Sequence, residues 1–270
     1  MADIAETPFP APAGSPRQDA GVAALRLRGL TKRFGEKLAV AGLDLEVPRG
    51  SFYGFVGPNG AGKTTSLSMA TGLLRPDQGA AEVGGIDVWE RPLAAKRRMG
   101  VLADGVVLFN RLTGEQLVTY AGLLRGMDRE TVAQRSADLL RVLGLADAAD
   151  TLVADYSAGM TKKIALASAM IHAPELLVLD EPFEAVDPVS ARTIRGLLDS
   201  YVASGGTVIL SSHVMDLVER MCTHVGVITE GRLLASGTVE QVRDGQDLES
   251  RFVELVGLEG GEQELSWLRL

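Results

Sequence analysis

The chain has 270 residues, of which 46% are hydrophobic and 23% are charged, with a formal net charge of −8 at pH 7. These values are ordinary for a globular protein with a large core, and the negative charge argues against a nucleic-acid-binding surface. The lone Cys222 leaves no partner for an intrachain disulfide, and no apolar run approaches the roughly 18 residues that a membrane-spanning helix needs. We expect a protein of a reducing cytoplasm that does not cross a membrane by itself.

The first part of the chain predicts a leader followed by an antiparallel β-subdomain. Residues 1–21 are rich in Pro, Ala and Gly, which is typical of a disordered segment. Residues 22–47 contain two runs in which apolar and polar side chains alternate, as they do in half-buried strands. The apolar faces of these two runs consist of Ala23, Leu25 and Leu27 and of Leu43, Leu45 and Val47.

A glycine-rich segment between a predicted strand at 52–56 and a predicted helix at 66–70 fits the phosphate-binding pattern G-x-x-x-x-G-K-[ST]. In this setting glycines let successive backbone N–H groups surround a phosphate, and the helix N-terminus adds partial positive charge. Lys63 is expected to reach the β- and γ-phosphates of a nucleotide, and the Thr64 hydroxyl to ligate Mg²⁺. The predicted nucleotide-binding residues of this loop are Gly57, Asn59, Gly60, Ala61, Gly62, Lys63, Thr64 and Thr65.

The remaining elements predict a parallel α/β core that is interrupted by a helical insert. Two late strands are almost entirely apolar, as parallel strands buried on both faces are. In the insert, Val132, Ser136, Leu139, Leu140 and Leu143 share one face of a predicted helix, and Gly144 is expected to stop that helix. The expected elements are strands near 81–83 and at 99–102, helices between 103 and 156 and at 161–170, strands at 176–179 and 207–210, and a short amphipathic helix near 248–256.

Two acids follow the apolar strand at 176–179. Asp180 at the carboxyl end of a strand, beside a phosphate loop, is placed to hold Mg²⁺ through a water. Glu181 is expected to orient or deprotonate the water that attacks the γ-phosphate. The alternative is a pair of solvated loop acids, which is common after any strand.

Further motifs resemble the nucleotide-binding subunit of ATP-binding cassette (ABC) transporters over about residues 24–242. Residues 156–160 are similar to the family's LSGGQ signature, and Ser211-Ser212-His213 is similar to its H-loop. The resemblance implies an α/β P-loop NTPase core that hydrolyses ATP with Mg²⁺, with Glu181 and His213 as its catalytic residues. It also implies ATP contacts by Phe34, stacked on adenine, by Ser157, Gly159 and Met160 of the signature, and by Asp187 of the D-loop.

Several of these residues also have ordinary structural interpretations. Phe34 could be an exposed aromatic at a strand end, and Ser157 could be a plain helix N-cap. Asp187 precedes a proline and is a good N-cap, which is compatible with a D-loop role. The pair Lys162-Lys163 is expected to form a solvated helix face.

The sequence departs from the family pattern at two motifs. The family usually places a glutamine after the strand at 99–102, where this chain has Asp104. An aspartate is a hard oxygen ligand that could approach Mg²⁺ through a water, or it could be a solvated loop acid. Ala158 replaces a signature glycine and Met160 replaces the glutamine, and this form resembles exporter subunits more than importer subunits.

After the leader at 1–21, we expect a nucleotide-binding domain at 22–245 with a helical subdomain at about 103–165, and a tail with a short helix at 246–270. The resemblance further implies that two subunits, identical or different, sandwich ATP between them and drive a separately encoded transmembrane permease that docks near residues 104–113. The chain would then lie on the cytoplasmic face of the membrane, touching it only through the permease and binding no nucleic acid. A soluble ATP-gated clamp and a regulatory scaffold that holds ATP without turnover are the alternatives.

Overall fold

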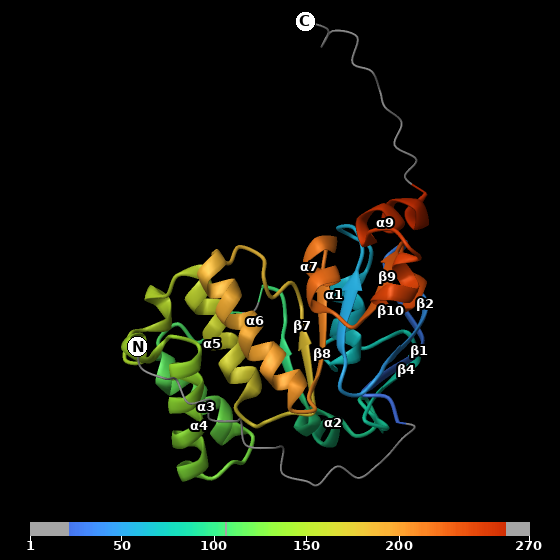
Figure 1. Ribbon diagram of the computed structural model, residues 1–270. Helices are drawn as coiled ribbons and strands as arrows, with labels where there is room; N and C mark the ends of the chain where they lie inside the picture. The colour runs from blue at the N-terminus through green and yellow to red at the C-terminus, as the bar shows by residue number, and fades with distance from the viewer. Residues whose placement is uncertain (1–21, 106, 258–270) are drawn as a thin grey trace, which may run out of the picture.

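Two β-sheets form the framework of the protein (Figure 1). The structure is a computed structural model that describes residues 22–105 and 107–257. The predicted disordered leader at 1–21 lies outside the described residues. The sheets have four strands in the order β2-β1-β4-β5 and six strands in the order β10-β9-β3-β8-β7-β6.

The four-stranded sheet is antiparallel and comes from the N-terminal part of the chain. Its strands are β1 (Leu25–Phe34), β2 (Lys37–Val47), β4 (Gln78–Val83) and β5 (Ile86–Asp87). Leu25 pairs with Val47 and Leu27 pairs with Leu45, so the apolar faces of both strands meet the same core. The predicted antiparallel β-subdomain is thereby confirmed.

The six-stranded sheet is mixed and carries the phosphate loop. Strands β3 (Phe52–Val56), β6 (Met99–Leu102), β7 (Leu176–Leu179) and β8 (Thr207–Ser212) are parallel. β9 (His224–Thr229) runs parallel to β3, and β10 (Arg232–Thr238) returns antiparallel to β9. This last hairpin was not predicted, because β10 is a partly exposed edge strand with weak apolar alternation.

Helices flank the sheets, and those of the insert lie on the side away from the antiparallel sheet (Figure 1). They are α1 (Lys63–Ala70), α2 (Pro92–Arg98), α3 (Gly114–Leu124), α4 (Arg129–Val142), α5 (Ala158–Met170), α6 (Pro188–Ala203), α7 (Met215–Met221), α8 (Val239–Arg243) and α9 (Leu248–Val256). Two 3₁₀ turns, Ala146–Ala148 and Val153–Asp155, connect α4 to α5. Among the described helices, none combines the length and apolar character that a membrane span requires.

Two helices begin earlier than the sequence pattern predicted. α1 begins at Lys63 rather than at residue 66, because Gly62 adopts a left-handed conformation that turns the phosphate loop directly into the helix. α5 begins at Ala158 rather than at residue 161, because the Ser157 side chain accepts a hydrogen bond from the backbone N–H of Met160.

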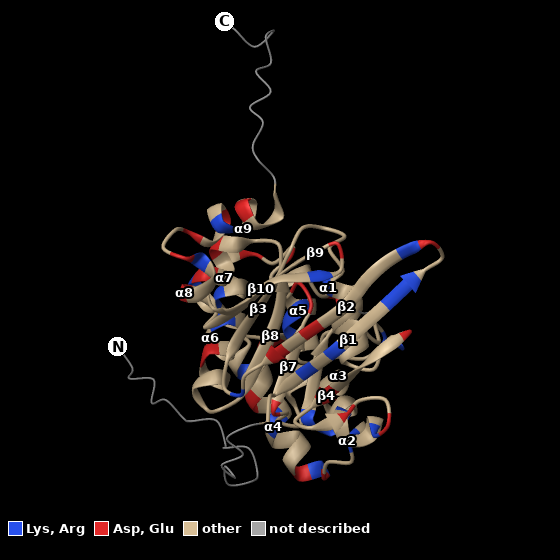
Figure 2. Cartoon of the chain, turned by 90° about the vertical axis from the view of Figure 1, so that its right-hand side faces the viewer, with Lys and Arg blue, Asp and Glu red and all other residues tan. Residues whose placement is uncertain are grey.

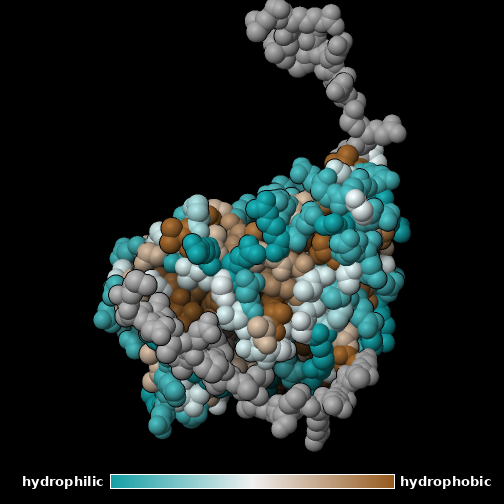
Figure 3. Space-filling model, viewed as in Figure 1, coloured by the Kyte–Doolittle hydropathy of each residue, from teal (hydrophilic) through white to brown (hydrophobic). Residues whose placement is uncertain are grey.

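Two apolar clusters stabilise this arrangement. One lies between the antiparallel sheet, α1 and the near face of the mixed sheet, and it includes Leu25, Phe55 and Met69. The other joins the far face of the mixed sheet to the helical insert, and it includes Leu179 and Ile164. On the face shown in Figure 3, apolar surface also gathers over α5 and α6, while most of the remaining surface in that view is polar. The two clusters hold the sheet that positions the site from both sides.

Candidate functional site

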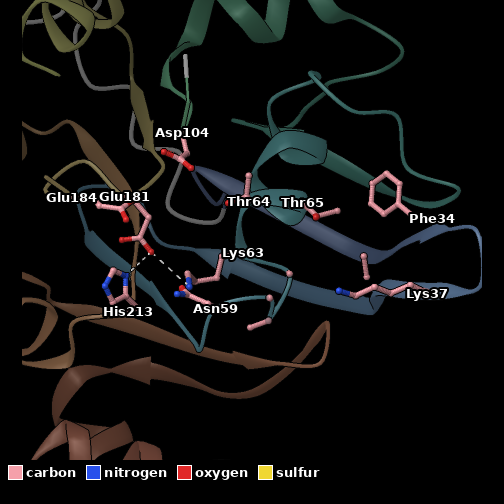
Figure 4. A pocket seen from close by; sticks show the side chains of 14 residues that line it. Phe34, Lys37, Asn59, Lys63, Thr64, Thr65, Asp104, Glu181, Glu184 and His213 are labelled. Atoms are coloured by element: carbon pink, nitrogen blue, oxygen red, sulfur yellow. Dashed lines mark hydrogen bonds and ion pairs between the residues drawn. The ribbon is translucent and has the colours of Figure 1, made fainter. Parts of the chain in front are cut away.

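A pocket of about 360 Å³ opens where the phosphate loop, the hairpin end of β1 and β2, and the carboxyl ends of β6, β7 and β8 converge. Phe34 and Lys37 lie at one end of this pocket, and Asp104, Glu181 and His213 lie at the other (Figure 4). Its lining is Phe34, Lys37, Ala39, Asn59, Gly60, Ala61, Gly62, Lys63, Thr64, Thr65, Asp104, Glu181, Glu184 and His213. Most of the residues predicted from the phosphate loop and the strand ends therefore share one cavity.

The phosphate loop has a backbone that only glycine fits at several positions. Gly60 and Gly62 have φ of 82° and 103°, in the left-handed region. A Cβ on Gly57 would lie 2.2 Å from the Ile228 carbonyl oxygen, so β9 approaches this residue too closely for any side chain. Lys63 is buried, and its Nζ donates to the Gly57 carbonyl at 2.7 Å. The Lys63 side chain thus connects the end of the phosphate loop to its start and fixes the position of the ammonium group.

The Glu181 carboxylate lies between two nitrogen atoms (Figure 4). Its Oε1 is 3.2 Å from His213 Nδ1 and 3.6 Å from Lys63 Nζ. Glu181 has φ of 45°, which is uncommon for a residue with a side chain and is maintained only where the surroundings over-determine it. A carboxylate, an imidazole and an ammonium group at one end of a pocket can position a water and a phosphate oxygen together.

Hydrogen bonds from two other elements hold the backbone of Glu181. Its N–H donates to Ser211 Oγ at 2.9 Å, and the Ser211 hydroxyl donates to Asp180 Oδ1 at 2.5 Å. Asp180 is buried at the end of β7 and does not line the main pocket. Lys162 Nζ donates to the Glu181 carbonyl at 3.0 Å. The interpretation of Lys162-Lys163 as a solvated face is therefore wrong, since Lys162 contacts the site and Lys163 is buried.

The opposite end of the pocket presents the Phe34 ring, which is half exposed. Lys32 Nζ lies 5.8 Å from the centroid of this ring and donates to Asp77 Oδ1 at 2.8 Å. The hydrogen bond from Lys32, followed by one from the Arg33 N–H, lowers the pKa of Asp77. Lys and Arg residues colour the ribbon blue near this end of the hairpin in Figure 2. The contact between Lys32 and Asp77 thus borders the Phe34 ring, which offers an aromatic surface at the rim of the pocket.

Oxygen groups suited to Mg²⁺ lie in and near the pocket. Thr64 and Asp104 line the pocket, and Asp180 lines a separate small cavity between α1 and the ends of β6 and β7. Within residues 22–105 and 107–257, no three His, Cys, Asp or Glu side chains gather as a protein-built metal cage requires. Mg²⁺ takes only one or two protein ligands when phosphates and waters supply the others, so this donor set fits Mg²⁺ rather than a structural metal.

The predicted signature and D-loop residues lie outside this pocket. Ser157 and Asp187 both act as N-caps, of α5 and α6, and the backbone N–H of Ser190 holds the pKa of Asp187 below its usual value. A Cβ on Gly159 would lie 2.7 Å from Asp187 Oδ2, so the two helix starts are packed together. Met160 lies in the first turn of α5 and is partly buried. In a single chain these residues form a second surface rather than part of the cavity.

Three lining residues, Lys37, Ala39 and Glu184, were not predicted as site residues from the sequence. Lys37 opens β2 directly after the turn that follows Phe34, so hairpin pairing was the signal that could have placed it. Glu184 is the first residue of the segment that resembles the family's D-loop, of which only Asp187 was predicted to contact ATP. The Glu184 N–H donates to the Glu181 carbonyl at 3.2 Å, which holds it beside the pocket.

The chain matches the protein-family model described as "ABC transporter" over residues 40–184. It is 37% identical to the daunorubicin/doxorubicin resistance ATP-binding protein DrrA of Streptomyces peucetius, over 82% of this chain and 67% of the relative. It is 38% identical to the Nod factor export ATP-binding protein I of Burkholderia lata, over 80% of this chain and 71% of that relative.

Solved structures show the same fold. An ATP-binding subunit of an ABC transporter superposes with a TM-score of 0.81 at 27% identity, over 86% of this chain and 99% of that one. A nucleotide-free ATP-binding cassette superposes with a TM-score of 0.74 at 23% identity, over 87% and 98% of the two chains, and at that identity it speaks for the fold alone.

Proposed function

Because the chain belongs to the ABC transporter family of ATP-binding proteins, we propose that it hydrolyses ATP in the pocket described above and thereby powers a membrane exporter. The observation that carries this proposal is the placement of Lys63, Glu181 and His213 at one end of a pocket whose other end is the Phe34 ring. An aromatic platform and a phosphate-binding end in one cavity match the two ends of ATP.

The proposed position of ATP assigns a task to each end. Adenine stacks on Phe34, and the phosphates follow the glycine-rich loop to Lys63. The γ-phosphate then lies near Glu181, which accepts a proton from the attacking water or orients that water, while His213 contacts the transferred phosphoryl group. The 3.2 Å separation of Glu181 Oε1 and His213 Nδ1 keeps both side chains beside the same reacting centre.

Mg²⁺, when bound, neutralises charge on the β- and γ-phosphates. Thr64 supplies a hydroxyl oxygen, and Asp180 supplies a carboxylate that acts through a water. Asp104 is proposed to add a second carboxylate in the position where the family usually has a glutamine. The short hydrogen bond from Ser211 to Asp180, at 2.5 Å, holds that buried carboxylate in a fixed orientation.

A second subunit is proposed to complete each ATP site. Ser157 is exposed at the start of α5, and the helix N-terminus that it caps favours a phosphate through its dipole and its first backbone N–H groups. These groups lie outside the pocket of their own chain, so a partner's ATP could reach them. Gly159 and Met160 would line the same surface, and Asp187 would lie beside it. ATP would then join two subunits until it is hydrolysed.

Coupling to transport is proposed to occur through the loop and helix that follow β6. Phe109 is 60% exposed and packs edge-on against Tyr120 of α3, with ring centroids 5.6 Å apart. Leu124 of the same helix is 68% exposed, so apolar side chains are available to a permease there. The subunit would lie at the cytoplasmic face of the membrane and touch it only through that permease. The relatives' names, in drug resistance and Nod factor export, favour an exporter over a soluble clamp.

Isolation of the tagged chain from membranes of its own host in mild detergent tests this proposal. We expect a protein with about six membrane-spanning segments to co-purify and the complex to hydrolyse ATP. The same complex containing Lys63→Ala should assemble but lack ATPase activity. Recovery of an active chain only in the fraction free of membranes would contradict the exporter assignment.

A further inference from the structure

Among the described side chains of α5, only Lys162 forms a hydrogen bond with Glu181. Its Nζ lies 3.0 Å from the Glu181 carbonyl oxygen, across a sequence separation of 19 residues. The adjacent Lys163 is buried. Successive residues of a helix point about 100° apart, so the two lysines occupy different surroundings although they are neighbours in sequence.

Lys162 contacts the backbone of Glu181, which adopts an unfavourable conformation. Glu181 has φ of 45°, a left-handed conformation that is unfavourable for a residue with a Cβ. Three hydrogen bonds meet its peptide groups: its N–H donates to Ser211 Oγ, and its carbonyl accepts from Glu184 N–H at 3.2 Å and from Lys162 Nζ at 3.0 Å. Only the bond from Lys162 comes from a charged donor, and charged donors form the stronger hydrogen bonds.

The side-chain direction of Glu181 depends on this backbone. A residue that leaves the left-handed region rotates its Cα–Cβ bond, which moves the carboxylate. The carboxylate now lies 3.2 Å from His213 Nδ1 and 3.6 Å from Lys63 Nζ, and misplacement by about 1 Å can cost on the order of 100-fold in rate.

We propose that Lys162 is a positioning residue for ATP hydrolysis, which holds the Glu181 carbonyl so that the Glu181 carboxylate faces the reacting end of the pocket. Lys162 does not line the pocket and acts through Glu181 alone. The proposal rests on the assignment of Glu181 as the catalytic carboxylate.

The test compares Lys162→Met, which keeps the length of the side chain and removes the donor, with Lys162→Arg, which keeps a charged donor. We expect Lys162→Met to lower kcat by about 10-fold to 100-fold, as the loss of one charged hydrogen bond does, with KM for ATP changed less than about twofold. Lys162→Arg should recover most of kcat. Lys96→Met, at an exposed lysine of α2, removes the same charge elsewhere and should leave both constants unchanged.

A double-mutant cycle separates positioning from a general structural effect. In a Glu181→Gln background the carboxylate is absent, so adding Lys162→Met should lower the residual rate by less than about twofold. An undiminished second loss in that background would overturn the proposal, as would a Lys162→Met loss that appears in KM rather than kcat. If Lys162→Met does not fold, Lys162→Arg and Lys162→Gln, compared by thermal unfolding and kcat, provide the same contrast.

The cycle also distinguishes the two claims. A wild-type rate for Glu181→Gln alone would mean that the proposed catalytic site is wrong. A slow Glu181→Gln together with a fully active Lys162→Met would leave the catalytic site in place and refute only the role of Lys162.

Discussion

His172 should make the stability of the protein depend on pH. It follows α5 and is partly buried, and the Arg125 guanidinium lies 2.9 Å from its Nε2. The Met99 carbonyl oxygen lies 3.1 Å from the same Nε2 and favours a protonated ring, but burial and the positive charge of the guanidinium outweigh it and favour the neutral imidazole. Burial, and then the charge of Arg125, lower the pKa of His172 from 6.5 to about 3. The folded protein therefore keeps His172 neutral at pH values where the unfolded chain protonates it.

The magnitude follows from linkage. Because the folded pKa lies below the unfolded pKa, the unfolded state binds more protons between the two values, and stability falls as pH falls through 6.5. From pH 7 to pH 5 this single group should remove about 2 kcal/mol from the free energy of unfolding. That result is insensitive to the folded pKa provided that it stays below about 4, since the proton then binds only the unfolded chain at pH 5.

Equilibrium urea unfolding of the wild type and of His172→Gln, at pH 7 and pH 5, measures this contribution. All other titrating groups are common to the two proteins. We expect the wild type to lose about 2 kcal/mol more than the variant over this interval, with similar m-values. Equal losses in the two proteins would refute the reasoning, because His172 would then take up its proton in the folded state as readily as in the unfolded chain.

Four further substitutions test the site and its surroundings. Lys63→Ala should abolish ATP binding or turnover, since it removes the cation aimed at the β- and γ-phosphates, and near-normal ATPase activity at saturating Mg-ATP would show that the site is misassigned. Asp104→Gln should raise the affinity for ATP in EDTA but change the affinity for Mg-ATP little. Without Mg²⁺ the Asp104 carboxylate and the γ-phosphate, about 4 Å apart, would repel each other by ~1–4 kcal/mol at dielectric constants of 80–20. If the variant and the wild type have equal affinities in both conditions, Asp104 is a solvated loop acid. Gly159→Ala should cost about 1–3 kcal/mol in urea unfolding, because its Cβ would lie 2.7 Å from Asp187 Oδ2. Gly196→Ala in α6, where nothing lies within 4 Å, should instead stabilise by up to about 1 kcal/mol, and the reverse order would contradict the packing argument.

Local patterns predicted the parts of the site that depend on local chemistry. The phosphate loop is recognisable because Gly60, Gly62 and Lys63 are needed at fixed spacing by the loop itself. Glu181 could be placed because it follows an apolar strand in a chain that also has a phosphate loop, and in such folds ligands bind at the carboxyl ends of the strands. The antiparallel sheet followed from the alternation in β1 and β2, which pairs Leu25 with Val47.

Contacts between distant elements could not be predicted in this way. The hydrogen bond from Lys162 to the Glu181 carbonyl and the close packing of Gly159 against Asp187 depend on how α5 meets the end of β7 and the start of α6. In sequence Lys162 resembles any exposed helix lysine. Likewise, nothing in the sequence distinguishes His172 from other residues that follow a helix, because its partner Arg125 lies at the end of α3, 47 residues earlier in the chain. Such pairings are properties of tertiary packing, which one sequence does not display.

The most direct test of the central claim is ATP hydrolysis by Glu181→Gln. The amide cannot accept a proton, so this variant should bind ATP nearly as tightly as the wild type while hydrolysing it at least about 100-fold more slowly. The trapped ATP should also hold two subunits together on size-exclusion chromatography. Glu175→Gln, the same substitution at the opposite end of β7, should hydrolyse ATP at the wild-type rate. Hydrolysis by Glu181→Gln at the wild-type rate would contradict the account, because Glu181 would then not be the catalytic carboxylate.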